Sequence, residues 1–174
     1  MSNSPFFHIG EIDTGTIHEH INNTFDISRL DKEIVISYDK FPVKLPCLDT
    51  QLKEVFKVYY DNLGSQGYRY NIEGEIDYEL FLVISPPWST KSWTKGIKVL
   101  SHDRTNVINI HIFLNNSVTM FSYFCPFNDD VITVPCQKNT MVVYPDFWGS
   151  LFKHCNTFDK PTVYLRCVMG LSSQ

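Results

Sequence analysis

The side chains in this sequence with the greatest capacity for chemistry are its cysteines and histidines. The five cysteines are Cys47, Cys125, Cys136, Cys155 and Cys167, and no two of them form a Cys-x-x-Cys pair. An odd count without such pairs disfavours both a structural zinc site and a framework of disulfide bonds. We therefore expect small, buried side chains with free thiols.

Three histidines stand in patterns that could serve a site. His18 and His20 would place both imidazoles on one side of an extended chain, a pattern that some metal sites use. Their segment is polar, so solvated side chains are the simpler expectation. His111 lies in the apolar segment 107–114, where a buried and hydrogen-bonded histidine is expected. The sequence contains no Gly-x-Ser-x-Gly, phosphate-binding loop or Gly-x-Gly-x-x-Gly motif, which leaves hydrolases, NTPases and dinucleotide-dependent enzymes without support.

The elements that must position these side chains are mostly strands. One helix is expected at about 50–63, because its apolar residues form a single stripe, with Asp49 as N-cap and Gly64 as stop. Residues 1–30 are expected to form loops and short extended pieces. Strands are expected at 33–38, 78–85, 107–114, 118–124, 131–134, 140–144 and 162–169. This order predicts a mainly β sandwich, jelly roll or barrel with one flanking α-helix.

Composition agrees with that fold class. The 174 residues include no alanine, the strongest helix former, and 14% are aromatic. The length favours a single domain, 1–174, with a β core at about 78–170 and with N-terminal strands and a supporting helix in 1–77. The same bias is typical of an AT-rich genome, which points to a viral or phage origin.

Charge excludes several kinds of partner. Lys and Arg total 15 against 19 Asp and Glu, for a formal net charge of -4. Nucleic-acid binding is not expected, because no basic stripe is present. No apolar run is long enough for a membrane span, and the N-terminal residues do not form a signal peptide. We expect an intracellular or virion location without secretion.

Two segments carry a resemblance to a known family. Residues 101–115 read Ser-His-Asp-Arg-Thr-Asn-Val-Ile-Asn-Ile-His-Ile-Phe-Leu-Asn, and 139–150 read Asn-Thr-Met-Val-Val-Tyr-Pro-Asp-Phe-Trp-Gly-Ser. This resembles the iron(II)/2-oxoglutarate-dependent oxygenases, in particular the prolyl-hydroxylase-like members of phages and other viruses. The resemblance implies a double-stranded β-helix, which is a jelly roll. It also implies an iron site of a His-x-Asp pair plus a distant histidine, and a basic residue for 2-oxoglutarate.

The sequence departs from that pattern at two positions. With His102 as the first ligand, Arg104 takes the carboxylate position, and a cation cannot ligate iron. Five residues after Pro145, where the distal histidine is expected, the chain has Ser150. We therefore interpret the sequence as a jelly roll with a degenerate iron triad.

An active site would require atypical ligands. His102, Asp103 and His154 would then hold iron(II), and Lys160 or Arg166 would bind 2-oxoglutarate. Adjacent residues on an extended chain point to opposite faces, so His102 and Asp103 would need a local bulge to act together.

Three tryptophans are candidate binding or interface residues: Trp88, Trp93 and Trp148. Tryptophan is a frequent anchor at interfaces, and the alternative is an aromatic plug at one end of the barrel.

The leading hypothesis is a non-catalytic structural, binding or assembly module that needs no cofactor. Its expected partners are other proteins, either copies of itself or components of a virus or phage particle. The alternative is an active iron(II)/2-oxoglutarate-dependent hydroxylase, and a second alternative is a cupin-like small-molecule binder with an apolar barrel mouth.

Overall fold

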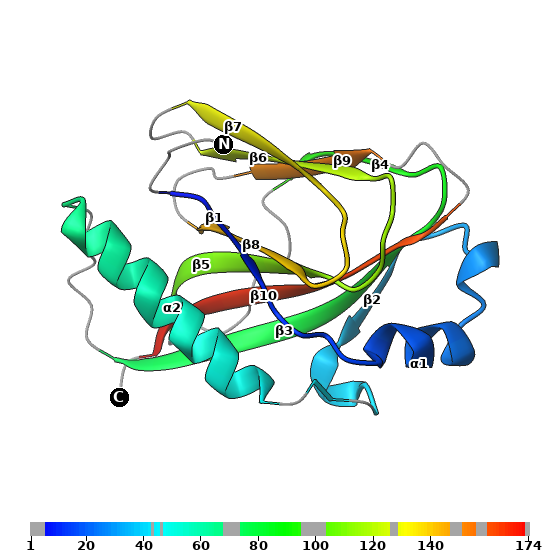
Figure 1. The fold of residues 1–174 in the computed structure, drawn as a ribbon, viewed down its shortest axis with the longest axis horizontal. Helices are drawn as coiled ribbons and strands as arrows, with labels where there is room; N and C mark the ends of the chain where they lie inside the picture. The colour runs from blue at the N-terminus through cyan, green and yellow to red at the C-terminus, as the bar shows by residue number, and fades with distance from the viewer. Residues whose placement is uncertain are drawn as a thin grey trace.

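Two antiparallel sheets face each other in the computed structural model, which describes residues 6–42, 44–45, 47–67, 74–94, 104–125, 129–146, 151–155 and 160–172 (Figure 1). The larger sheet has the order β1 (His8–Glu11), β8 (Thr140–Pro145), β5 (Arg104–Phe113), β10 (Thr162–Ser172), β3 (Glu75–Ser85), β2 (Ile34–Ser37). The smaller sheet has the order β4 (Thr90–Thr94), β9 (Leu151–Cys155), β6 (Met120–Cys125), β7 (Asp130–Pro135). The predicted mainly β jelly roll is confirmed.

Two apolar layers hold this arrangement together. One lies between the larger sheet and the helices and includes Leu52 and Phe56 of the long helix with Leu82 and Ile110 of the sheet. The other lies between the two sheets and is rich in aromatic side chains. Strand β3 contributes alternate residues to both layers, as expected for a strand that is covered on both faces.

The predicted helix is α2 (Leu48–Ser65), and its limits differ from those expected. Cys47, with φ of 54°, occupies the N-cap position, whereas Asp49 lies in the first turn and pairs with Lys53 at 3.1 Å. A carboxylate is favourable there because it faces the positive end of the helix dipole. Gly64 does not stop the helix, since the fully buried Leu63 anchors its last turn.

The expectation of loops in residues 1–30 is wrong for α1 (Ile17–Thr24). Ile17 and Ile21 are four residues apart and both are buried, which is a short helical pattern among polar residues. His18 and His20 therefore lie on a helix, where residues two apart do not face each other, and they do not form the two-imidazole arrangement of an extended chain. Two 3-10 turns follow, η1 (Ile27–Arg29) and η2 (Tyr38–Lys40).

Strands were found at every expected position, and β1 is one of the short extended pieces expected within residues 1–30. Two short strands, β4 and β9, had not been expected. The expected burial of all five cysteines is only partly right. Cys125, Cys136 and Cys167 are buried, whereas Cys47 and Cys155 are exposed. Within the described part of the chain, no helix has the length and apolar character needed to cross a membrane.

Candidate functional site

The structure locates only some of the predicted site residues. His102, Asp103, Trp148 and Ser150 lie outside the described residues. His154 lies in β9 and is buried, with 2% of its surface exposed. The proposed iron ligand set of His102, Asp103 and His154 therefore stays a prediction.

Strand β5 spans the length of the larger sheet. Its first residue, Arg104, is opposite Ser172, and its last, Phe113, is opposite Tyr164. His154 lies near this last end, because its ring is 6.5 Å from that of Tyr164. At about 3.3 Å per residue, roughly 30 Å of strand separates the two ends of β5.

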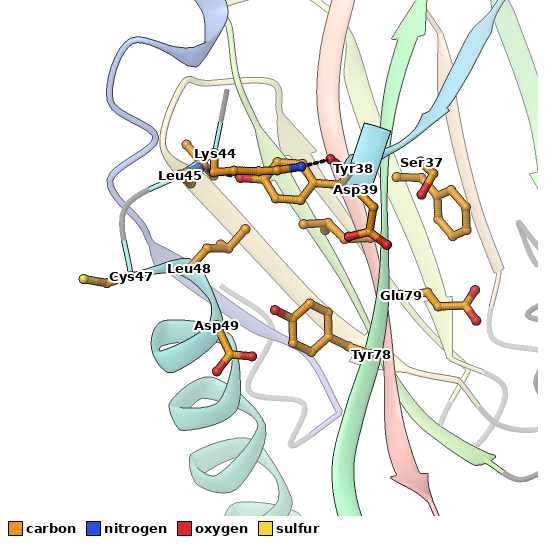
Figure 2. Close-up of a pocket in the computed structure, with 12 residues that line it drawn as sticks. Ser37, Tyr38, Asp39, Lys44, Leu45, Cys47, Leu48, Asp49, Tyr78 and Glu79 are labelled. Carbon is orange, nitrogen blue, oxygen red and sulfur yellow. Dashed lines mark hydrogen bonds between the residues drawn. The ribbon is translucent and has the colours of Figure 1, made fainter. Parts of the chain in front are cut away.

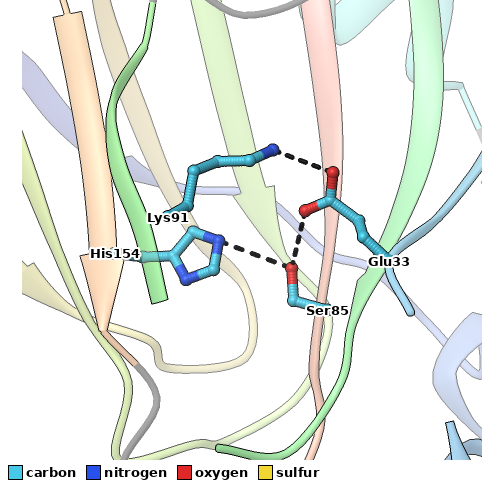
Figure 3. Close-up of polar contacts among 4 residues, drawn as sticks. All are labelled: Glu33, Ser85, Lys91 and His154. Atoms are coloured by element: carbon cyan, nitrogen blue, oxygen red, sulfur yellow. Dashed lines mark hydrogen bonds and ion pairs between the residues drawn. The ribbon is translucent and has the colours of Figure 1, made fainter. Parts of the chain in front are cut away.

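A polar network surrounds His154 at the end of β3 (Figure 3). The Ser85 hydroxyl donates to Glu33 Oε2 at 3.1 Å and lies 3.5 Å from His154 Nε2. Lys91 Nζ donates to Glu33 Oε1 at 2.9 Å, and Lys91 is the register partner of His154 across the β4–β9 pair. The network thus joins the segment before β2 to the ends of β3, β4 and β9.

Electrostatics keep His154 neutral near pH 7. Burial, together with a smaller effect of the positive charge of Lys91 and against an opposing effect of Glu33, lowers the pKa of His154 to about 4. Within the described residues, His154 Nδ1 is buried and has no hydrogen-bond partner. The positive charge that acts on this imidazole comes from Lys91 on the neighbouring strand β4.

His111 lies at the centre of the space between the sheets. It is completely buried, its Nδ1 is 2.9 Å from the Tyr123 hydroxyl, and its Nε2 is 3.3 Å from the Tyr144 hydroxyl. Burial lowers the pKa of His111 well below its usual value, with a further contribution from Arg166. The expectation of a hydrogen-bonded core histidine is confirmed, and both ring nitrogens are engaged.

Arg166 lies in β10 with its side chain among the same aromatic rings. It is 2% exposed, and its guanidinium carbon is 4.9 Å from the centre of the Phe152 ring. It also hydrogen-bonds the Tyr144 side chain. Lys160, the other predicted cosubstrate residue, is exposed and precedes β10. Of these two basic residues, only Arg166 lies in the interior with His154.

The two described tryptophans lie on the surface. Trp88 is 69% exposed and has a positive φ of 57°. Trp93 is 40% exposed, its ring is 6.2 Å from that of Phe124, and Lys153 Nζ is 4.7 Å from its centre. Exposure of this kind is compatible with an interface role.

The residues that the structure describes do not by themselves provide the ligand set of an iron(II) centre. Such a centre needs two imidazoles and a carboxylate with open positions between them. His111 has both nitrogens engaged, and the Glu33 carboxylate is bound by Lys91 and Ser85. No group of three or more His, Cys, Asp or Glu side chains that could hold a metal occurs among the residues that the structure describes.

Sequence reasoning missed the residues that shape this interior, above all Lys91, Glu33 and Ser85. Nothing in their local sequence marks them, because they come together only through the pairing of β4 with β9 and of β2 with β3. Tyr123, Tyr144 and Tyr164 were detectable as inward positions of alternating strands, although their convergence on His111 was not.

Comparison with solved structures defines the class of fold. The chain has the double-stranded β-helix fold of the iron(II)/2-oxoglutarate oxygenases, and the resemblance seen in the sequence is confirmed at this level. No family model matches the sequence, and no curated protein matches it.

Three solved structures illustrate the likeness. A prolyl-4-hydroxylase from Pseudomonas putida has a TM-score of 0.61 and 11% identity, covering 96% of this chain and 93% of that one. A viral collagen prolyl hydroxylase from Paramecium Bursaria Chlorella virus-1, in its 2-oxoglutarate complex, has a TM-score of 0.60 and 8% identity, covering 97% of both chains. EvdO2 from Micromonospora carbonacea var. aurantiaca, complexed with 2-oxoglutarate, has a TM-score of 0.63 and 11% identity, covering 97% and 87%. At these identities the likeness establishes the fold.

Proposed function

We propose that this chain is a non-catalytic binding or assembly module built on an oxygenase-type jelly roll. The observation that carries the proposal is the position of Lys91. It stands opposite His154 on the neighbouring strand, and its ammonium is tied to Glu33 at 2.9 Å.

A cation in this position disfavours a bound metal ion. Like charges at short range repel, and the repulsion is stronger where water is partly excluded. The side chains of Lys91 and Glu33 are 29% and 30% exposed, so water screens them only in part. The Glu33 carboxylate already accepts from Lys91 and Ser85, so ligation of iron by Glu33 would break both contacts.

The surroundings of Arg166 support the same proposal. An incoming carboxylate would have to replace the contacts of the guanidinium with Phe152 and Tyr144. These rings also pack on His111, with centroid distances of 4.6 Å and 5.3 Å. A cosubstrate in this space would therefore disturb a close-packed core, which is energetically costly.

The alternative is an active hydroxylase with His102, Asp103 and His154 on iron(II) and Lys160 or Arg166 on 2-oxoglutarate. The fold supports it, because its structural neighbours include 2-oxoglutarate-dependent enzymes. A cupin-like binder is the second alternative. We retain the viral or phage particle as the proposed setting on composition alone, with other proteins as partners.

Anaerobic titration calorimetry with iron(II) and 2-oxoglutarate tests the proposal. We expect no micromolar binding of either and no succinate above background, because the described residues of the interior offer no matching donor set. A prolyl-4-hydroxylase assayed in parallel serves as the positive control.

Micromolar iron binding together with succinate production would overturn the proposal. In that case the variant His154→Ala should abolish iron binding if the atypical ligand set is correct. Iron binding that survives His154→Ala would instead place the metal elsewhere.

A further inference from the structure

The smaller sheet forms one outer side of the molecule. α1 and α2 both contribute to the apolar cluster on the larger sheet, and the second cluster fills the space between the two sheets. The order of layers is therefore helices, larger sheet, smaller sheet (Figure 1). Among the described elements, both α-helices lie on the larger sheet, so the far face of the smaller sheet, which we call the outer sheet face, is turned to solvent.

Burial and register identify the side chains of the outer sheet face. Along β6, Phe121 and Tyr123 are buried between the sheets. Met120, Ser122 and Phe124 alternate with them and therefore point outward. Exposed residues of the neighbouring strands that share this face include Thr90, Trp93, Val131, Thr133, Lys153 and Cys155.

Large apolar side chains gather on the outer sheet face. Trp93 is 40% exposed, Met120 43% and Val131 54%. Trp88 and Val118, which are 69% and 52% exposed, closely precede β4 and β6. A solvated face of an antiparallel sheet usually carries polar side chains, and a large exposed apolar patch marks an interaction site. The outer sheet face therefore has the character of an interface.

The pocket beside α2 offers a partner much less exposed apolar surface. This pocket, of about 590 Å³, lies between β3, η2 and the start of α2 (Figure 2). Its leucines, Leu45, Leu48 and Leu80, are only 5–6% exposed. The apolar surface that association could remove from water lies instead on the outer sheet face.

The outer sheet face carries little charge. Lys153 is its one charged residue among the described positions, and the ammonium lies 4.7 Å from the centre of the Trp93 ring, a cation–π contact. Asp130 is the one acidic residue of the four strands, and its register partner is the buried Cys125, so it lies on the opposite face. Two copies of the outer sheet face can therefore meet without opposing rows of like charge, although each chain has a formal net charge of -4.

We propose that the outer sheet face binds the same face of a second copy of this chain, sheet on sheet, in a two-fold dimer. Two sheets that pack face to face keep their strands within about 30° of each other. A two-fold dimer uses one surface patch twice, so the patch must be complementary to itself.

The position of Lys153 selects the direction of the two-fold axis. In the middle row of the face, Lys153 of β9 is the register partner of Ser122 of β6. An axis along the strands places β9 of one copy over β6 of the other, so that Lys153 meets a serine. An axis across the strands would place Lys153 over its own copy, which is unfavourable because like charges repel.

Size favours a second sheet as the occupant. Four strands about 4.8 Å apart are about 19 Å wide, whereas an α-helix with its side chains is only about 10–12 Å wide. With strands of five to six residues, the face covers roughly 350 Å². Two copies together bury at least about 700 Å², and Trp88 and Val118 extend this toward the roughly 1,200 Å² below which weak complexes fall. We therefore expect a weak, reversible dimer.

This inference rests on the proposed function in that it names a second copy as the partner of an assembly module. The two can nevertheless fail separately, because iron binding and succinate report on the barrel interior and oligomeric state reports on the outer sheet face. Succinate production would overturn the proposed function and leave the dimer intact, whereas a chain that stays monomeric would overturn the dimer alone.

Sedimentation velocity of the full-length protein, from micromolar to submillimolar concentration, tests the dimer. We expect one reversible step from the mass of one chain to that of two, with a Kd of about 10–100 μM. A single species with the mass of one chain throughout this range would overturn the proposal. Species larger than two chains would also overturn it, because a face that pairs with itself closes at two copies.

Two matched variants test whether the dimer uses this face. Val131→Asp places a charge on the outer sheet face and should raise the Kd at least about tenfold, or about 1.4 kcal/mol. Val58→Asp makes the same change at a valine of α2 with similar exposure, 51% against 54%, and should keep the Kd within about twofold. Urea unfolding checks that both variants fold. Equal Kd values for the two variants would overturn the proposal.

The two exposed cysteines give a second readout on the unmodified protein. Cys155 lies on the outer sheet face, and Cys47 lies at the start of α2. Alkylation of Cys155 by N-ethylmaleimide should slow in proportion to the dimer fraction found by sedimentation, while Cys47 reacts at a constant rate. A dimer in which Cys155 reacts as fast as in the monomer would overturn the proposal, since the contact would then lie elsewhere.

Discussion

At the scale of single residues, several polar groups of the interior are buried among aromatic rings. His111 is bonded to two tyrosine hydroxyls, and Arg166 lies against Phe152 and Tyr144. Burial raises the pKa of Tyr123, Tyr144 and Tyr164, so these hydroxyls stay protonated. The Arg166 guanidinium is therefore surrounded by neutral tyrosine and histidine side chains in the described interior.

The two buried histidines predict a pH dependence of stability. Burial lowers the pKa of His111 well below 6.5 and that of His154 to about 4. Below about pH 6.5 the unfolded chain binds protons that the folded chain does not, so the free energy of unfolding falls as the pH falls. Each histidine contributes a slope of about 1.4 kcal/mol per pH unit between its unfolded and folded pKa values. Above about pH 6.5 the histidine is neutral in both states, so it contributes no slope there.

Urea unfolding at pH 7.5, 6 and 5 measures this slope. His111→Phe should lower stability at pH 7.5 by about 1–3 kcal/mol, because two tyrosine hydroxyls lose their partner, and should flatten the slope below pH 6.5. His8→Gln, at an exposed position, is the control and should keep the original slope. An unchanged slope in His111→Phe would show that this residue does not carry the pH dependence.

At the scale of elements, α2 closes the outer face of the larger sheet. Its buried residues Leu48, Leu52, Phe56, Tyr59 and Leu63 recur at three- and four-residue spacing, and this stripe made the helix predictable. α1 was not predictable in the same way, since two isoleucines in eight residues give little periodic signal. Burial against the sheet, rather than helical propensity, stabilises both helices.

Two truncations on α2 test whether burial against the sheet stabilises this helix. Leu52→Ala removes a fully buried side chain and should lower the free energy of unfolding by about 2–5 kcal/mol. Val58→Ala, on the same helix but 51% exposed, should change it by less than about 0.5 kcal/mol. Chemical denaturation gives both values, and similar losses for the two variants would mean that α2 does not pack as described.

At the scale of the whole molecule, strands far apart in the sequence complete each sheet. β1 pairs with β8, so that His8 lies opposite Val143. Phe6, which precedes β1, is 2% exposed, and its carbonyl accepts a hydrogen bond from Tyr59 of α2. The first described residues thus join the long helix to a strand from the last third of the chain.

This long-range closure predicts a large effect from a substitution near the N-terminus. Phe6→Ala should cost about 3–5 kcal/mol, which corresponds to a decrease in Tm of about 2–4 °C per kcal/mol. Ile9→Ala, in β1 and 51% exposed, is the matched control and should unfold within a few degrees of the unmodified protein. Calorimetric scans would contradict the described docking if Phe6→Ala unfolded like the control.

The sequence by itself determined the fold class, because apolar periodicity and turn residues are local properties. The expected strands and the long helix are present, as is the jelly roll that the resemblance implied. The sequence also marked His154 and Arg166 as candidate site residues, and both are buried in the interior.

Only the tertiary structure decided what surrounds those residues. Lys91, Glu33 and Ser85 come from three separate strand or loop segments, and strand pairing alone brings them to His154. The extent to which β2 pairs with β3 likewise depends on where β2 ends, at the turn η2. Residue type and spacing report which face of an element is buried, whereas the partners of a buried group depend on contacts between distant segments.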